Sequence, residues 1–220
     1  MTVVIAIDGP SGSGKSTVAR GVAAELGLPV LDTGAMYRAV ALAVLERGSA
    51  IDDVETCAAV AHEAAIELEE GRTRLNGRDV SREIRGPEVT AAVSIVSAHP
   101  AVREVLVARQ REWVARHGGG VVEGRDIGTV VFPAATLKVF LTASDDERAR
   151  RRHLDEEVAA RQVAVADVKA ALERRDALDR GRAVSPLQAA DDAVMIDTTG
   201  ADVDTVVSDI VARARAAEET

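Results

Sequence analysis

The sequence predicts an α/β fold in which a parallel β-sheet is flanked by helices. Continuous apolar segments, which are typical of buried parallel strands, alternate along the chain with segments of helical spacing. A glycine-rich turn joins the first of these strands to the first helix. The 220 residues, of which 47% are hydrophobic, suit one α/β domain or a core with small inserts.

The first part of the chain alternates between strand and helix. Gly27 is expected to end the first helix, and Asp52 is expected to cap the third. In order, the expected elements are a strand at 3–7, a helix at 17–26, a strand at 30–31, a helix at 34–46 and a helix from 52 to about 65.

The pattern changes between residues 66 and 80, where apolar residues fall in short alternating segments. Asn76-Gly77 lies within this stretch and is a strong signal for a tight turn. We therefore expect a small antiparallel sheet inserted into the α/β pattern. Two helices should follow, at 88–97 and 101–117, with Pro87 and Pro100 near their starts.

The rest of the chain returns to the α/β pattern. Ser144 and Glu147 are spaced as in a capping box, which opens an arginine-rich helix. The other expected elements are strands at 121–123, 137–141 and 193–196 and helices at 165–178 and 203–216. Because active groups in such folds lie at the carboxyl ends of strands, the polar clusters at 9–16, 32–38 and 124–126 are expected to face one crevice.

Composition excludes several classes of protein. The formal net charge of −9 does not favour a nucleic-acid partner. Cys57 is the single cysteine, and the four histidines lack metal-ligand spacing, so we expect no disulfide and no structural metal. The chain shows no signal-peptide pattern, no apolar run of transmembrane length and no heptad run. A cytoplasmic protein with no membrane partner, and a monomer, is therefore expected.

The segment Gly9–Ser16 fits the phosphate-binding loop pattern G-x-x-x-x-G-K-[ST]. It lies between a buried strand and a helix, where backbone N–H groups and a helix N-terminus can surround a phosphate. Lys15 would reach the β- and γ-phosphates of a nucleoside triphosphate, and the Ser16 hydroxyl would face Mg²⁺. The alternative is an ordinary loop rich in glycine and serine.

Other features narrow the class of phosphate-binding protein. The [NT]-K-x-D segment of GTPases is missing, and the single D-x-x-G run, at 197–200, comes too late in the chain for their metal-binding switch. Phosphoryl transfer between two anions requires alignment and positive charge. Arg125, the arginines at 148–152 and those at 175–182 could supply that charge, which favours a small phosphotransfer enzyme. A solvated helix face is the alternative for 148–152.

Three further motifs carry a resemblance to a known family. Residues 31–38, 123–133 and 175–187 resemble those of bacterial cytidylate kinases, P-loop enzymes of the nucleoside monophosphate kinase type. The similarity runs nearly end to end and includes the small sheet. It implies a core of 1–33, 81–142 and 176–220, a monophosphate-binding region of 34–98 with the small sheet at 66–80, and a lid of 144–175.

The resemblance also implies the reaction. The family transfers the γ-phosphate of ATP, with Mg²⁺, to CMP or dCMP. Positions matching its ATP site are Gly9, Pro10, Ser11, Gly12, Ser13, Gly14, Lys15, Ser16, Thr17 and Arg151, with Ser16 as the magnesium ligand. Catalytic roles fall to Lys15, Arg125, Arg148, Arg152 and Arg182.

For the acceptor CMP, the resemblance implies three groups of residues. A hydroxyl and guanidinium groups suit the phosphate dianion, and a carboxylate, a hydroxyl and an arginine suit the hydrogen-bonding edge of cytosine but not of uracil. The phosphate positions are Thr33, Arg38, Arg125 and Arg182, with Tyr37 on the same helix face as Thr33; the cytosine positions are Ser94, Arg103 and Asp126; the ribose positions are Arg175 and Asp179.

Plainer interpretations exist for several of these residues. Tyr37 could be packed in the core, and Ser94 could be a routine helix residue. Arg103 could pair at the surface with Glu104 or Glu112, and Arg175 with Asp179 could form an ordinary i,i+4 salt bridge.

The chain departs from the family pattern at two positions, with Glu123 where aspartate is common and Thr33 where serine also occurs. Both changes keep the functional group. Two other functions stay open: a small P-loop kinase with a different nucleotide or metabolite acceptor, and a nucleotide-binding regulatory module without transfer activity.

Overall fold

The computed structural model describes residues 2–69, 71–158 and 164–218, and the chain divides into two compact units. The first unit comprises Met1–Val30 and Gly118–Thr220, and the second comprises Leu31–His117. The expected division into core, monophosphate-binding region and lid stays a prediction. Residues 159–163 of that lid, residue 70 of the small sheet and terminal residues 1, 219 and 220 lie outside the described residues.

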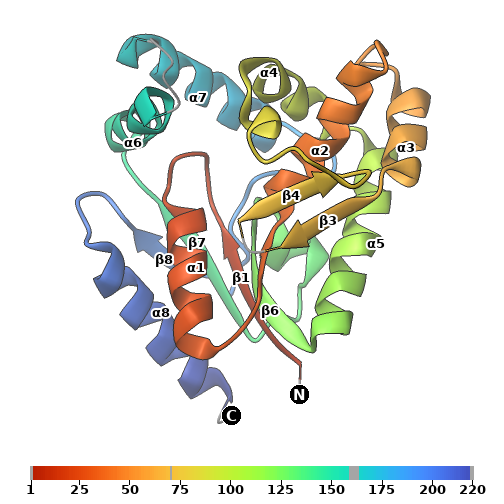
Figure 1. Cartoon of the computed structure of the whole chain (residues 1–220). Helices are drawn as coiled ribbons and strands as arrows, with labels where there is room; N and C mark the ends of the chain where they lie inside the picture. Colours follow the sequence, from red (N-terminus) through yellow and green to blue (C-terminus); the bar gives the residue numbers. More distant parts are fainter. Residues whose placement is uncertain (1, 70, 159–163, 219–220) are drawn as a thin grey trace. The chain divides into compact units, whose positions relative to one another are not determined.

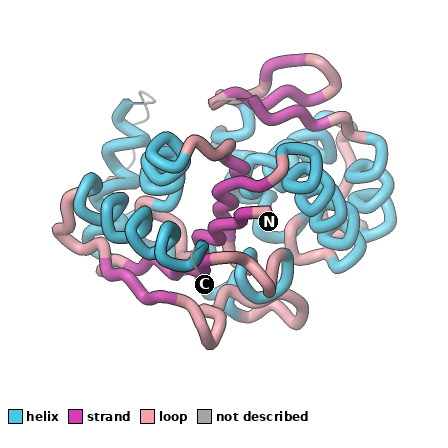
Figure 2. The backbone as a smooth tube through the Cα atoms, turned by 90° about the horizontal axis from the view of Figure 1, so that it is seen from below, coloured by secondary structure: helices cyan, strands magenta, loops and turns pink. Residues whose placement is uncertain are grey.

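A sheet of parallel strands organises the first unit (Figures 1 and 2). It has five strands in the order β2-β6-β1-β7-β8. Strand β1 pairs in parallel with β6 and β7, and β7 pairs in parallel with β8. The predicted parallel sheet is therefore confirmed. The strands are β1 (Val3–Asp8), β2 (Val30–Asp32, within which the chain passes into the second unit), β6 (Gly119–Gly124), β7 (Leu137–Thr142) and β8 (Val194–Asp197).

Helices α1 (Lys15–Leu26) and α8 (Val203–Glu218) lie side by side against this sheet (Figure 1). Their apolar faces share one core with the strands, built from branched residues such as Ile5, Val22 and Ile210. At Gly21 of α1 an added Cβ would lie 2.7 Å from the Val207 side chain of α8, so the two helices pack closely there. Gly27, with φ 66°, ends α1 as predicted.

Two further helices of the first unit, α6 (Asp145–Val158) and α7 (Val165–Arg180), pack together through Ala149, Val168 and Leu172. The Ser144 hydroxyl accepts a hydrogen bond from the Glu147 N–H at 3.3 Å. This contact is one half of the predicted capping box, and it fixes the start of α6.

Among its described residues, the second unit contains four α-helices and the small antiparallel sheet, in the order β3-β4-β5. Asn76 and Gly77, with φ of 51° and 80°, form the predicted turn between β4 and β5. The elements are α2 (Thr33–Glu46), α3 (Val54–Glu63), β3 (Ile66–Glu69), β4 (Arg72–Leu75), β5 (Arg78–Asp79), the 3₁₀ turn η1 (Glu83–Arg85), α4 (Pro87–Val96) and α5 (Pro100–His117).

The expected cap of α3 was wrong by one residue. Asp53, not Asp52, has the extended backbone of a cap, and its carboxylate accepts from the Thr56 N–H at 3.1 Å and from the Thr56 hydroxyl at 2.6 Å. Asp53 lies three residues before Thr56, which supplies both donors.

In the described ranges no single helix is long and apolar enough to cross a membrane; α4 and α5, bent by 99°, pass that test only when taken together.

Helix α5 carries Trp113, the only tryptophan of the chain. Its ring stacks on that of His117, with the centroids 4.1 Å apart. Together with Ile66 and Leu68 of β3, Trp113 lines a cavity of about 220 Å³ within the second unit.

Candidate active site

The predicted phosphate-binding loop follows β1 and leads into α1. Gly9 has φ 148°, and a Cβ there would lie 2.2 Å from the Leu141 carbonyl oxygen, so another residue would not fit without a shift. Gly14 has φ 87° and directly precedes Lys15, the first residue of α1. The glycines therefore allow the backbone to turn tightly into a helix N-terminus, where N–H groups attract an anion.

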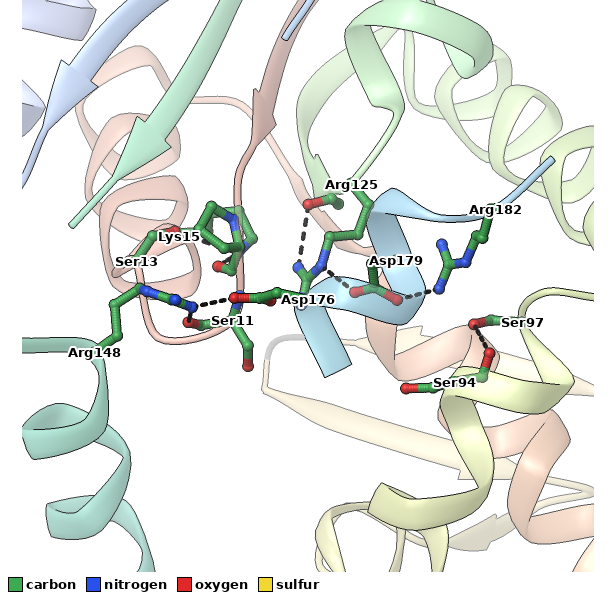
Figure 3. A network of polar contacts seen from close by, with 12 residues as sticks. Ser11, Ser13, Lys15, Ser94, Ser97, Arg125, Arg148, Asp176, Asp179 and Arg182 are labelled. Carbon is green, nitrogen blue, oxygen red and sulfur yellow. Dashed lines mark hydrogen bonds and ion pairs between the residues drawn. The ribbon is translucent and has the colours of Figure 1, made fainter. Parts of the chain in front are cut away.

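Lys15 is buried beneath this loop. Its Nζ donates to the Pro10 carbonyl oxygen at 2.7 Å and lies 3.4 Å from the Ser13 hydroxyl (Figure 3). Burial and then repulsion by Arg125 lower the pKa of Lys15 to about 7. The ammonium group is thus held by neutral oxygens, in surroundings that would favour an added negative charge.

Ser16 and Glu123 place two oxygen atoms at the carboxyl end of the sheet. The Ser16 hydroxyl donates to Glu123 Oε2 at 2.8 Å, and Glu123 is buried in β6. Hydroxyl and carboxylate oxygens are the ligand types that Mg²⁺ uses together with nucleotide phosphates and water. The donor set at this point therefore fits the predicted magnesium ligand Ser16.

Asp179 of α7 gathers two arginines around one buried carboxylate. Its Oδ2 accepts from Arg125 Nε at 3.0 Å, and its Oδ1 accepts from Arg182 (Figure 3). Burial alone would raise the pKa of Asp179, but Arg125 and Arg182 bring it below its usual value. Burial and repulsion by Arg125 lower the pKa of Arg175 to about 10, and Arg175 Nε has no hydrogen-bond partner among the described residues.

The arginines of α6 divide between the interior and the solvent. Arg148 is buried; it pairs with Asp176 and donates to the Ser11 carbonyl oxygen at 2.9 Å (Figure 3). Arg150, whose side chain is 61% exposed, pairs with Glu147. The solvated-face alternative therefore holds for Arg150 and is wrong for Arg148, because Asp176 and the loop carbonyl replace water around its guanidinium group.

The other two predicted arginines of α6 are half-buried. Arg151 donates to the Thr198 hydroxyl at 2.9 Å and to the Thr198 carbonyl oxygen at 2.6 Å, which connects α6 to the residue after β8. Arg152 is among the charges that lower the pKa of Arg175. Arg151 thus contacts the segment after β8, and Arg152 adds to the positive charge around Arg175.

The second unit holds the predicted acceptor residues Thr33, Tyr37, Arg38, Ser94 and Arg103. Arg38 of α2 donates to the Ile84 carbonyl oxygen and to the Thr90 hydroxyl, both at 2.9 Å. Thr33, at the first position of the same helix, is buried and 3% exposed. These contacts anchor Arg38 to η1 and α4 within the unit.

Arg103 and Tyr37 meet within the second unit, with the guanidinium carbon of Arg103 5.3 Å from the centre of the Tyr37 ring. Arg103 is 3% exposed, which excludes the surface ion-pair alternative. Ser94 is also buried, and its carbonyl oxygen accepts from the Ser97 hydroxyl at 3.4 Å (Figure 3). The core alternative for Tyr37 agrees with its burial, although the ring also faces a cation.

Sequence reasoning missed three residues of the first unit. Asp8 accepts from backbone N–H groups after Asp126, Asp176 pairs with Arg148, and Thr198 donates to the Ser13 carbonyl oxygen at 3.1 Å. Asp126 itself is buried, 4% exposed, at the start of a five-residue π-helical turn, η2 (Ile127–Val131). The sequence signal that could have identified Asp8 is its position, since it is the one polar residue at the end of the apolar strand β1.

A glycine loop over a buried lysine, with arginines from several elements, defines a P-loop phosphotransferase. Similar folds occur in a gluconokinase from Sinorhizobium meliloti 1021 (TM-score 0.53, 17% identity, covering 99% of this chain and 95% of that one) and an uncharacterized protein from Eubacterium ventriosum ATCC 27560 (TM-score 0.57, 13% identity, 98% and 99%). These likenesses support the fold alone.

The family itself is shown by sequence. Residues 5–216 match the cytidylate kinase family, and the chain belongs to that family. It is 48% identical to a cytidylate kinase of Desulfitobacterium hafniense (strain Y51), over 94% of this chain and 90% of the relative. It is 53% identical to one of Mycolicibacterium paratuberculosis (strain ATCC BAA-968 / K-10), over 90% and 88%. The predicted resemblance, fold class and enzyme class are confirmed.

A longer relative contains a similar stretch. The bifunctional pantoate ligase/cytidylate kinase of Synechococcus sp. (strain JA-2-3B'a(2-13)) is 51% identical over 89% of this chain, which spans only 37% of that protein.

Proposed function

We propose that the chain transfers the γ-phosphate of ATP to CMP or dCMP, giving ADP and CDP or dCDP. The excess of buried positive charge around Asp179 is the observation that carries the proposal. Arg125 and Arg182 share that one carboxylate, and burial beside Arg125 lowers the pKa of Arg175 to about 10. Cations crowded in this way are costly without an anion. A phosphate dianion would relieve the cost.

On the donor side, the amides of the glycine loop and Lys15 would hold the β- and γ-phosphates of ATP. We propose Ser16 as a ligand of Mg²⁺, which supplies positive charge to the phosphate oxygens when bound. Arg148, Arg151 and Arg152 would neutralise the charge that spreads over the transferred group. The acceptor phosphate is already anionic at neutral pH, so the chemistry requires no general base.

On the acceptor side, we propose the roles that the family pattern assigns. Arg125 and Arg182 of the first unit, and Thr33, Tyr37 and Arg38 of the second, would bind the phosphate of CMP. Ser94, Arg103 and Asp126, which are 6%, 3% and 4% exposed, would read cytosine. Arg175 and Asp179 would bind the ribose. Buried polar groups of this kind discriminate strongly, because a base of opposite polarity leaves them unpaired.

A panel of CMP, dCMP, UMP and AMP, each with ATP and Mg²⁺ in a coupled assay of ADP formation, tests the proposal. CMP and dCMP should be phosphorylated well and the other two poorly. Equal use of UMP or AMP would point to the kinase with another acceptor. ATP binding without acceptor-dependent ADP formation would point to the regulatory module.

The Asp126→Ala variant tests the base-reading role separately. It should impair the use of CMP much more than the binding of ATP, and equal losses of both would contradict the assignment. The monomeric state and the cytoplasmic location stay predictions.

A further inference from the structure

Asp8, the last residue of β1, makes two hydrogen bonds to a distant segment of the first unit. Its Oδ1 accepts from the Ile127 N–H at 2.9 Å, and its Oδ2 accepts from the Gly128 N–H at 2.8 Å. The carboxylate is buried, with 5% of the residue exposed. Asp8 also stands in register with Gly124 of β6, so both strands end at the same edge of the sheet.

These two hydrogen bonds replace the side-chain cap that the turn η2 lacks at its start. The first N–H groups of a helical turn have no partner inside the turn. Asp126 occupies the cap position of η2, but its side chain makes no capping hydrogen bond. The carboxylate of Asp8, from the neighbouring strand, therefore satisfies both donors, and charged acceptors of this kind make strong hydrogen bonds.

The turn is also held on another side. A Cβ added to Gly128 would lie 3.2 Å from Cγ and Cδ of the Lys138 side chain. Lys138 in turn donates to both carboxylate oxygens of Asp192, at 2.9 and 2.8 Å. Asp8 and Lys138 thus confine η2, and the residues directly before it, Arg125 and Asp126, depend on that position.

We propose that Asp8 is a positioning residue for the acceptor nucleotide, fixing the turn that follows Arg125 and Asp126. The inference rests on the proposed acceptor roles of those two residues. Asp8 would act through the backbone of Ile127 and Gly128, without touching either nucleotide. Replacing the carboxylate should loosen the acceptor side and leave the glycine loop, which receives none of these bonds, largely unchanged.

The charge of Asp8 is sensitive to pH. Burial raises its pKa to about 6; the N–H groups of Gly128 and Ile127 and the charge of Lys15 oppose the rise, and the charge of Asp126 adds to it. A protonated carboxyl group accepts these bonds less strongly. The hold on the turn should therefore weaken as the pH falls below about 6.

The first test is the Asp8→Asn variant, in which one acceptor oxygen becomes a donor. The KM for CMP should rise about tenfold, while the KM for ATP should change by less than about twofold. The matched control is Asp53→Asn, which alters a carboxylate that accepts a backbone N–H at the start of α3. The control should leave both KM values unchanged. Equal increases in the two KM values of Asp8→Asn, or no increase, would overturn the proposal.

The second test needs neither a variant nor activity. Residue-resolved amide hydrogen exchange of the wild-type chain should show the Ile127 and Gly128 amides losing protection between pH 7.5 and 5.5, relative to Val122 in β6. Constant protection would contradict the pH dependence, and Ile127 and Gly128 amides that are unprotected at pH 7.5 would overturn the role of Asp8 even if Asp8→Asn failed to fold. A wild-type chain that does not phosphorylate CMP would instead reject the proposed function.

Discussion

The two compact units anchor their buried and half-buried arginines with different partners. In the first unit the guanidinium groups meet carboxylates: Arg148 pairs with Asp176, and Arg125 pairs with Asp179. In the second unit Arg38 donates to a backbone carbonyl and a hydroxyl, and Arg103 lies over the Tyr37 ring. The charged partners make the residues of the first unit depend on one another. Removing one carboxylate leaves an arginine whose positive charge is no longer compensated and is repelled by the neighbouring arginines.

Lys15 and Arg148, both in the first unit, differ in the direction in which their pKa values are shifted. Asp145 and Asp176 outweigh burial and raise the pKa of Arg148. Lys15, held by the Pro10 carbonyl and near the Ser13 hydroxyl, has a pKa lowered to about 7. Burial is the largest cause of the lowered pKa of Lys15, and no carboxylate hydrogen bond offsets it as Asp145 and Asp176 do at Arg148.

The largest effect is expected at Asp179. The Asp179→Ala variant should lower the free energy of unfolding by about 3–5 kcal/mol, because it strands buried arginines. Urea denaturation measures the loss, and added inorganic phosphate should recover part of it by binding the cluster. Asp209→Ala, which breaks an exposed pair with Arg213, is the control and should change it by less than about 1 kcal/mol. Equal effects of the two variants would remove the distinction between the anchors.

The second effect concerns pH. The folded chain loses the Lys15 proton near pH 7, whereas the ordinary pKa is 10.5, so between these values the unfolded chain binds more protons. Stability without nucleotide should therefore rise with pH across this range relative to Lys15→Met, by at least about 1 kcal/mol. Urea titrations of both proteins at pH 7 and pH 9.5 measure the difference. Parallel pH profiles would show that neutral anchors do not weaken the charge.

The smallest effect is expected in the second unit. Thr90→Val removes one neutral acceptor from Arg38 but leaves the Ile84 carbonyl, so stability should fall by about 1 kcal/mol. The KM for CMP should rise a few-fold, with the KM for ATP unchanged. Thr205→Val, on the exposed surface of α8, is the control. A loss as large as that of Asp179→Ala would mean that both units are equally interdependent.

The predictable parts of the molecule are those set by neighbouring residues. The glycine loop, the stop at Gly27 and the turn at Asn76-Gly77 each depend on a local backbone requirement, and all were predicted. The cap of α3 shifted from Asp52 to Asp53, because two adjacent aspartates compete and only the contacts of Thr56 decide between them.

The parts that local sequence missed depend on contacts between distant residues. Asp8 and Ile127 are 119 positions apart, and Arg148 and Asp176 are 28 apart on two helices. Ser94 and Arg103 carried no individual signal and were identified only through the family resemblance. Both residues are buried in the structure, and composition and spacing do not distinguish a buried polar residue from an exposed one.

The stacked pair of Trp113 and His117 gives the second unit an optical probe of its own. Because the chain has one tryptophan, its emission reports this unit alone. Circular dichroism follows the helices of both units. A difference between the two melting curves would show that the halves of the enzyme unfold independently, and coincident curves would show one cooperative transition.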